Sequence, residues 1–185
     1  MPRGRVRDRA GPLGRCKRRK TSAMTIDSVE PRGAEKKEAF FRAAEEKVHA
    51  FAFTVPDVEA PNGRINCYLA KTDSCSATIL VLRDGYQASH HYHPNQDGIW
   101  VVLKGRVRFF GGADEKNMGE YGPFEGIKQP ENSRYGFQAV GDEEAWLMQI
   151  AGFPKGAEVA KRIPIGAPPA REGGVKVDMA RPVGP

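Results

Sequence analysis

The sequence has few cysteines and no long apolar run. Its 185 residues include Cys16, Cys67 and Cys75, an odd number without a C-x-x-C pair. Because disulfide frameworks use paired cysteines, this pattern argues for a reducing compartment and makes Cys67 and Cys75 candidates for ordinary core residues. No hydrophobic stretch approaches the roughly 20 residues of a membrane-spanning helix. We therefore expect a cytoplasmic protein without a membrane partner.

Basic side chains are not in excess over most of the chain. The net charge is +6, but residues 1–23 carry nine basic side chains against one acidic and contribute +8, so the remainder sums to −2. Nucleic-acid platforms combine basic stripes with aromatic residues, and the chain after residue 23 has none, so we expect no nucleic-acid partner. We interpret residues 1–30 as a disordered basic segment. It is a basic arm, a targeting segment or over-extended translation ahead of a true start at Met24, and we favour the last.

Helical signals are confined to one segment. Residues 34–50 are rich in helix formers and carry an imperfect apolar stripe, so we expect a helix and its lead-in over residues 31–60. After Phe153 the chain is dense in proline and glycine. We expect residues 154–185 to form an irregular tail that wraps the domain or a partner and adds little to the core.

From residue 64 onward the pattern changes to short β-rich runs separated by Gly, Pro, Asn and Asp. Strands are expected at residues 64–70, 77–83, 99–103, 106–110, 135–140 and 145–151. Many short strands at near-regular spacing, without helices between them, indicate an antiparallel sandwich, jelly roll or barrel. We place this all-β domain at residues 61–153.

Three of the four histidines stand within four positions of GYQASHHYHPNQDGIWVVLKG, residues 85–105. Alternation along an extended segment puts His91 and His93 on one face and His90 on the other. Two neutral imidazoles this close suit Fe, Zn, Cu, Ni or Mn, and we favour metal binding over a solvated histidine-rich loop. We expect His90 to make a polar contact at the surface or behind the pair.

The spacing around this pair resembles the first motif of the cupin superfamily, Gly-x5-His-x-His-x3,4-Glu-x6-Gly. The matching positions are Gly85, His91, His93, Gly98 and Gly105. The second motif, Gly-x5-Pro-x-Gly-x2-His-x3-Asn, fits less completely. Its positions hold Phe124, Pro130, Asn132, Tyr135 and Ala139. The resemblance covers roughly residues 64–152. It implies a cupin double-stranded β-helix, or jelly-roll barrel, with an N-terminal helical segment and irregular tails, and it implies a homodimer.

Two of the family's usual metal ligands are absent, because Gly98 stands at the Glu and Tyr135 at the third His. Asp97 would complete a set of two histidines and one carboxylate, although alternation places it on the opposite face, so that a bulge would be needed. Tyr135 would ligate as a phenolate if a metal lowered its pKa from about 10. Alternatively, Tyr135 is a buried aromatic, or a catalytic acid or hydrogen-bond donor to a substrate.

Side chains alternate along a strand, so if position 98 faces inward, Trp100 and Val102 do so as well. They would give the apolar, aromatic interior that is usual for a small-molecule pocket. The first functional hypothesis is a dioxygenase or isomerase acting on a small organic substrate. It uses a divalent metal held by His91 and His93 with help from Asp97 or Tyr135. Fe(II) is the first candidate, and Zn, Mn, Ni and Cu are alternatives. The second hypothesis is a non-catalytic cupin, for ligand binding or dimerisation, with a degenerate metal site.

Overall fold

The computed structural model describes residues 33–155, 161–166 and 173–181. The basic segment, with Met24 and Cys16, lies outside these residues. The chain divides into two units, Met1–Glu46 and Lys47–Pro185. None of the helices in the described part has the length and apolar character of a membrane span.

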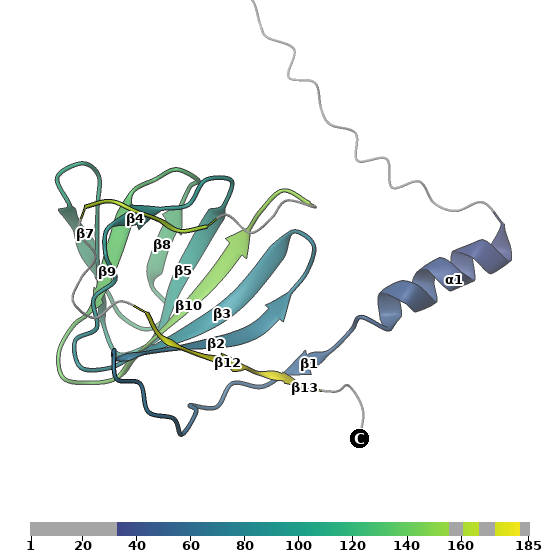
Figure 1. The fold of residues 1–185 in the computed structure, drawn as a ribbon, viewed down its shortest axis with the longest axis horizontal. Coiled ribbons are helices and arrows are strands. Elements are labelled where there is room, and N and C mark those ends of the chain that lie inside the picture. Colours follow the sequence, from purple (N-terminus) through teal and green to yellow (C-terminus); the bar gives the residue numbers. More distant parts are fainter. Residues whose placement is uncertain (1–32, 156–160, 167–172, 182–185) are drawn as a thin grey trace, which may run out of the picture. The chain divides into compact units, whose positions relative to one another are not determined.

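The first unit contains helix α1, Ala34–Glu45 (Figure 1). The helix follows Gly33 and ends at Glu45, five residues before the end of the stretch of helix formers at residues 34–50. None of its residues is buried, and Phe40 and Phe41 meet each other edge to face at 5.8 Å between ring centroids. The predicted apolar stripe therefore contributes no core residue to this unit.

The second unit is built from β-sheets (Figure 1). Its larger sheet has, in the described residues, six strands in the order β12-β2-β3-β10-β5-β8. Their bounds are β2 Arg64–Lys71, β3 Cys75–Leu82, β5 Asp97–Lys104, β8 Gly126–Gln129, β10 Ala145–Gly152 and β12 Val175–Asp178. Neighbouring strands are antiparallel except β12, which pairs with β2 in parallel.

A second sheet has the order β11-β4-β9-β6-β7. Its strands are β4 His91–Tyr92, β6 Val107–Gly111, β7 Lys116–Tyr121, β9 Tyr135–Ala139 and β11 Ile163–Pro164. The short strands β1 Ala50–Phe51 and β13 Ala180–Arg181 pair with each other. Within the described ranges no ladder joins the two large sheets, so the jelly roll is two facing walls rather than a closed barrel.

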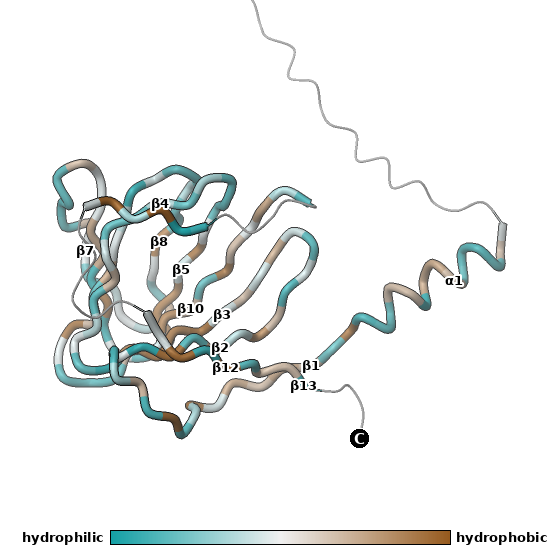
Figure 2. Tube along the Cα trace, viewed as in Figure 1, coloured by the Kyte–Doolittle hydropathy of each residue, from teal (hydrophilic) through white to brown (hydrophobic). Residues whose placement is uncertain are grey.

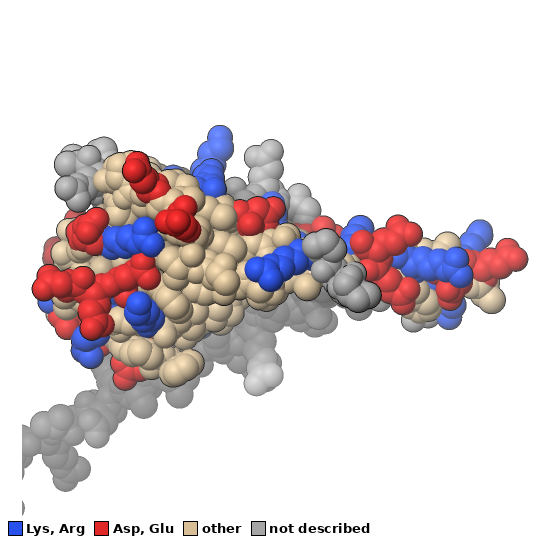
Figure 3. Space-filling view, turned by 90° about the horizontal axis from the view of Figure 1, so that it is seen from below, with Lys and Arg blue, Asp and Glu red and all other residues tan. Residues whose placement is uncertain are grey.

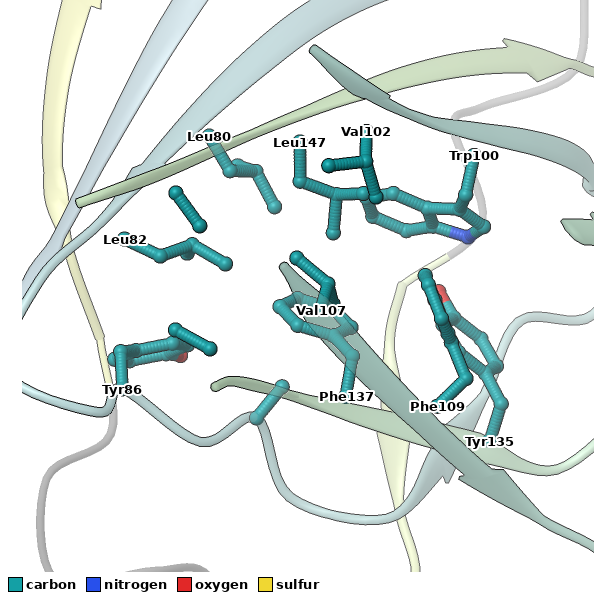
Figure 4. Packing of buried hydrophobic residues seen from close by; sticks show 13 residues of the cluster. Leu80, Leu82, Tyr86, Trp100, Val102, Val107, Phe109, Tyr135, Phe137 and Leu147 are labelled. Carbon is teal, nitrogen blue, oxygen red and sulfur yellow. The ribbon is translucent and has the colours of Figure 1, made fainter. Parts of the chain in front are cut away.

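The main core lies between these walls, and Figure 4 shows its side chains converging from both of them. Its buried members are Leu80, Leu82, Tyr86, Ala88, Trp100, Val102, Val107, Phe109, Tyr135, Phe137, Ala139, Ala145 and Leu147. Trp100 and Val102 belong to this core, so the inward parity predicted from position 98 is confirmed. Hydrophobic stretches lie within the strands, and the loops that join them are mostly hydrophilic (Figure 2).

The outer face of the six-stranded sheet is also covered. Ile79 and Val81 of β3 point into a second buried cluster, against which Phe53 and Val55 pack. This burial on both faces explains why β3 reads as a continuous apolar run. Met179, from the tail that was expected to add little to the core, is a buried member of the same cluster. The described parts of the tail thus run along the domain as β11, β12 and β13.

Charged side chains of both signs are interspersed at one end of this domain's surface, whereas the middle of the same face carries few of either (Figure 3). Ion pairs join neighbouring strands or loops: Arg83 Nε lies 2.7 Å from Glu144, and Arg108 Nε lies 2.9 Å from Glu120. Pairs of this kind at a surface contribute about 1 kcal/mol or less each, so burial of the two apolar clusters dominates the stability of the fold.

Candidate functional site

Strand β4, which lies between β11 and β9, places His91 directly opposite Tyr135 of β9. Both side chains are buried, with exposed fractions of 3% and 1%, and their ring centroids are 4.4 Å apart. His93 is partly exposed, and its ring lies 5.2 Å from His91 and 6.4 Å from Tyr135. The structure therefore brings together three residues that the sequence singled out.

One hydrogen bond determines which nitrogen of His91 is available to a ligand. His91 Nδ1 lies 2.6 Å from the backbone oxygen of Ser89. A carbonyl only accepts, so Nδ1 carries the proton and Nε2 presents a lone pair, as in metal-binding histidines held by a carbonyl. Burial lowers the pKa of His91 to about 3, the bond to Ser89 opposes this, and the charge of Arg162 adds to it. His91 is therefore neutral at ordinary pH.

At two positions where the second cupin motif has glycine, this chain has another residue with a positive φ angle, which glycine adopts most readily. Asn132 has φ 61° and Phe124 has φ 68°, both in the left-handed region. The Asn132 N–H donates to the His93 carbonyl oxygen at 2.9 Å, which ties this loop to the histidine segment. The conformations support the alignment that sets Tyr135 at the position of the third histidine.

Asp97 is exposed on β5, as alternation indicated, so the alternative in which a bulge brings it to the histidine pair finds no support. Its side chain is exposed, and Oδ1 accepts a hydrogen bond from the Glu131 N–H at 3.0 Å. Gly98, the next residue, is buried, so alternation holds along β5 without the bulge that ligation required. Among the described residues, no group of three or more His, Cys, Asp and Glu side chains is arranged to hold a metal.

The space left by the missing carboxylate is taken by Gln129, which sequence reasoning missed. Gln129 lies opposite Gly98 in the β5–β8 ladder, is 2% exposed, and has its Oε1 2.9 Å from where a Gly98 Cβ would be. The same Cβ position is 3.6 Å from Trp100 Nε1. Gln129 lies in a segment rich in Gly and Pro that gives no strand signal. Its only sequence signal is its position directly before Pro130 of the second motif.

Three buried polar atoms around Gly98 and Tyr135 have no hydrogen-bond partner among the described residues: Gln129 Oε1, Trp100 Nε1 and Tyr135 Oη. Figure 4 shows the indole nitrogen of Trp100 and the hydroxyl of Tyr135 on the same side of the core. The indole N–H lies near enough to act on the phenol without forming a hydrogen bond of normal geometry. Unpaired buried polar groups are costly, so this cluster is suited to a water molecule or a polar ligand group.

The protonation of Tyr135 is governed by its burial. Burial raises the pKa of the phenol well above its usual range, while the charge of Arg162 and the indole N–H of Trp100 act in the opposite direction. Without a bound cation Tyr135 is therefore a neutral phenol. This favours its role as a hydrogen-bond donor over its role as a phenolate ligand.

A second residue that the sequence analysis missed is Arg162. Its Nη2 donates to the Ser89 hydroxyl, and Arg162 precedes β11, the strand that pairs with β4. The pairing joins positions 71 and 73 residues apart, such as Tyr92 with Ile163 and His91 with Pro164. The only local signal for strand β11 was the short alternation of Ile and Pro in RIPIG, residues 162–166. Such a short run containing proline is weak evidence for an edge strand.

The remaining candidates lie away from the pair. His90 is buried, which rules out the surface alternative of its prediction, and its Nδ1 lies 3.6 Å from Glu115 and its ring 6.4 Å from Phe110. Cys67 is a buried core residue whose pKa is raised by burial, and Cys75 is partly exposed. These positions confirm the interpretation of Cys67 as an ordinary core residue.

Comparison with solved structures identifies the fold. The chain is similar to an uncharacterized conserved protein with a double-stranded β-helix domain from Klebsiella pneumoniae subsp. pneumoniae, with a TM-score of 0.51 and 14% identity over 67% of this chain and 95% of that one. It is also similar to the cupin domain of Schizosaccharomyces pombe Cnp3 (TM-score 0.48, 14% identity, 56% and 74% covered) and to KdgF from Halomonas sp. (TM-score 0.48, 18% identity, 58% and 94% covered).

No protein-family model matches the sequence, and none of the curated proteins compared with it matches significantly. At these identities the structural likeness shows the fold alone. The chain has the double-stranded β-helix fold that the resemblance of its histidine motif implied.

Proposed function

We propose that this chain is a small-molecule-binding cupin that holds a divalent metal ion through His91 and His93. The observation that carries the proposal is the hydrogen bond from His91 Nδ1 to the Ser89 carbonyl. It keeps Nε2 unprotonated on a residue that is buried, neutral and in ring contact with His93. A neutral imidazole whose other nitrogen is held by a carbonyl is the form in which histidine binds metals.

The donor set fits a weakly held metal with open positions. Two imidazoles and the phenol of Tyr135 lie together, and the carboxylate of the usual cupin set has no counterpart at Gly98. A bound Fe(II), or Zn, Mn, Ni or Cu in its place, would supply Lewis acidity or a site for dioxygen. Water or a ligand would fill the positions that the protein leaves open.

The chain's own residues define what a ligand would meet. Tyr135, a neutral phenol beside the pair, would donate a hydrogen bond or a proton to an oxygen of the ligand. Trp100 and Gln129 add a donor and an acceptor that need partners. A small organic substrate with polar oxygen or nitrogen groups fits this arrangement. Dioxygenase or isomerase activity is the catalytic form of the proposal.

A second candidate function is ligand binding without catalysis. The cation of Arg162, joined through Ser89 to His91, opposes the approach of a second cation. Together with the glycine at position 98, this favours a cupin that holds metal only weakly and senses or sequesters a small molecule. The two functions share one site and differ in whether metal remains bound at equilibrium.

Metal analysis of the purified full chain distinguishes them. We expect about one equivalent of metal after incubation with Fe(II) under anaerobic conditions, and its loss in the His91→Ala/His93→Ala double variant. Parallel incubations with Zn, Mn, Ni and Cu identify the preferred ion. His49→Ala is the matched control, because this exposed histidine belongs to the same unit and lies outside the site.

The outcomes separate clearly. Metal that the control variant retains and the double variant loses supports the metal-binding function. A wild-type chain that stays metal-free, with the far-ultraviolet dichroism of a folded β-protein, eliminates it and leaves the non-catalytic function. Metal that disappears in Asp97→Asn would show that the exposed carboxylate moves to the site and would overturn the assignment made here.

A further inference from the structure

The neutral polar atoms around Gly98 differ in what they donate and accept. Gln129 Nε2 donates to the Pro130 carbonyl oxygen at 3.3 Å, so the amide is oriented with its Oε1 toward Gly98. This Oε1 only accepts hydrogen bonds, and Trp100 Nε1 only donates. Burial keeps Tyr135 a neutral phenol, so its O–H is available as a second donor. The cluster therefore offers two donors and one acceptor, and none of the three atoms has a hydrogen-bond partner among the described residues.

The three atoms lie around one small region of the core. A Cβ built at Gly98 would be 2.9 Å from Gln129 Oε1 and 3.6 Å from Trp100 Nε1. The Trp100 indole also lies near enough to act on the Tyr135 hydroxyl, and Figure 4 shows the indole nitrogen and this hydroxyl on the same side of the core. Gly98 has no side chain that could meet them. One small polar group placed between these atoms would contact all three.

The inner face of the six-stranded sheet is reached by solvent beside this region. Gln149 of β10 lies directly opposite Trp100, and residues paired in this way point to the same face of a sheet. Gln149 is partly exposed although it faces inward with Trp100. Ala151 lies opposite Gly98 in the same ladder, so this part of the inner face carries small residues. A small solute can therefore approach the polar cluster along the inner side of β10 and β5.

A hydroxyl group matches the cluster in full. Its two lone pairs accept from Trp100 and Tyr135, and its one hydrogen is donated to Gln129. An ether or carbonyl oxygen would satisfy the two donors but leave the Gln129 oxygen unpaired. A carboxylate would leave this oxygen unpaired as well, and it would bring a charge into contact with three neutral groups in a buried place, which is costly.

We propose that Gln129, Trp100 and Tyr135 bind one hydroxyl group of a small organic ligand, an alcohol or a phenol. The placement of this ligand beside His91 rests on the proposed function, since the Tyr135 ring contacts that imidazole. The preference for a hydroxyl belongs to the three polar side chains and does not require bound metal. Such groups discriminate between ligands, because a ligand without the matching group leaves them buried and unpaired.

Ligand-observed NMR titration of the metal-depleted full chain tests this preference with benzyl alcohol, benzyl methyl ether and toluene. The ether keeps the oxygen lone pairs and lacks the O–H, and toluene lacks both. We expect wild type to bind the alcohol about tenfold more tightly than the ether, and toluene most weakly. Gln129→Met should abolish the preference for the alcohol over the ether, because it removes the acceptor that distinguishes them.

Gln138→Met is the matched control. It makes the same change in β9 on the side away from the core, since both neighbours, Phe137 and Ala139, belong to the core. We expect it to keep the preference of wild type. Tyr135→Phe should weaken the binding of alcohol and ether alike, because it removes a donor that both use. This conservative variant decides the matter if Gln129→Met proves poorly folded.

The outcomes are distinct. Equal affinity of wild type for the alcohol and the ether, no binding of the alcohol, or a preference that Gln129→Met retains would each overturn the proposal. Toluene bound as tightly as the alcohol would show that a water molecule already pairs the three atoms, which overturns it as well. A hydroxyl preference that depends on Gln129 in a chain that holds no metal would leave this inference standing while the metal proposal falls.

Discussion

The amide oxygen of Gln129 lies where a side chain on Gly98 would begin, because a Cβ at position 98 would be only 2.9 Å from Gln129 Oε1. The two residues are partners across the β5–β8 ladder, and both are buried. A Cβ at position 98 would therefore force the end of the Gln129 side chain to shift. In this chain a neutral amide from β8 reaches toward position 98 of β5.

Gly98→Ala should destabilise the fold by about 1 to 3 kcal/mol, since the new methyl group forces the Gln129 amide away. In the double variant Gly98→Ala/Gln129→Ala the loss should be smaller than the sum of the two single losses, because the clash is gone. Urea denaturation of the four proteins measures this coupling. Gly152→Ala is the matched control on neighbouring β10, where a Cβ meets nothing within 4 Å. Additive effects of the two substitutions would contradict the placement of Gln129.

Tyr135→Phe should leave the metal-free protein as stable as wild type or about 1 kcal/mol more stable, since the lost hydroxyl is buried without a partner among the described residues. Tyr121→Phe is the control, because the Tyr121 hydroxyl donates to the Met118 carbonyl at 3.0 Å and its removal should not stabilise the protein. Thermal and urea unfolding measure both. A loss of more than 1 kcal/mol on Tyr135→Phe would mean that the hydroxyl has a partner.

Acid should unfold the metal-free protein partly through His91. Its folded pKa of about 3 lies below the unfolded value of about 6.5, so between these values only the unfolded chain takes up the proton. The contribution of His91 is present above pH 6.5 and declines by about 1.4 kcal/mol per pH unit as the pH falls toward 3. The unfolding free energies of wild type and His91→Phe should be measured from pH 7 to pH 4.5. Below pH 6.5 the difference between them should shrink by about 1.4 kcal/mol for each pH unit.

The control for acid unfolding is His49→Phe, because His49 is exposed. Its pH profile should run parallel to that of wild type. If His91→Phe also ran parallel to wild type, His91 would take up its proton over the same pH range in the folded and the unfolded protein. The lowering of the His91 pKa by burial would then be contradicted.

Phe124→Gly should stabilise the protein by about 1 kcal/mol. Phe124 adopts φ 68° while its side chain is 86% exposed, so glycine relieves backbone strain at little cost in packing. Phe124→Ala removes the same exposed ring but keeps a Cβ in the left-handed region, and it should not stabilise. Equal gains from both substitutions would assign the effect to the ring and not to the backbone.

Local periodicity predicted the all-β class and the direction in which His91 faces, and the resemblance of the histidine motif added the double-stranded β-helix. Alternation alone separates His91 from His90 and directs Trp100 inward. Alternation also indicated that Asp97 faces outward, as it does. It left open whether His90 lies at the surface or is covered, because alternation gives a direction and not what packs on that side.

Gln129 and Arg162 could not be predicted by the same reasoning. Gln129 lies in β8, a strand within a segment of Gly and Pro that suggests turns. Arg162 reaches the site only through the pairing of β11 with β4, and such pairing of distant segments leaves little trace in local sequence. Both residues lie beside the candidate site, so its polar surroundings depended on the structure, whereas the histidine pair did not.

The parallel pairing of β12 with β2 has a consequence for synthesis. A ribosome releases β2 and β3 long before residues 175–181, which supply the edge partner of β2 and the buried Met179. Until then the nascent chain carries an unprotected strand edge and an uncovered apolar face, both of which invite association with other chains. Strand β11 also emerges late, so β4 gains this partner only after β2 to β10 have been synthesised.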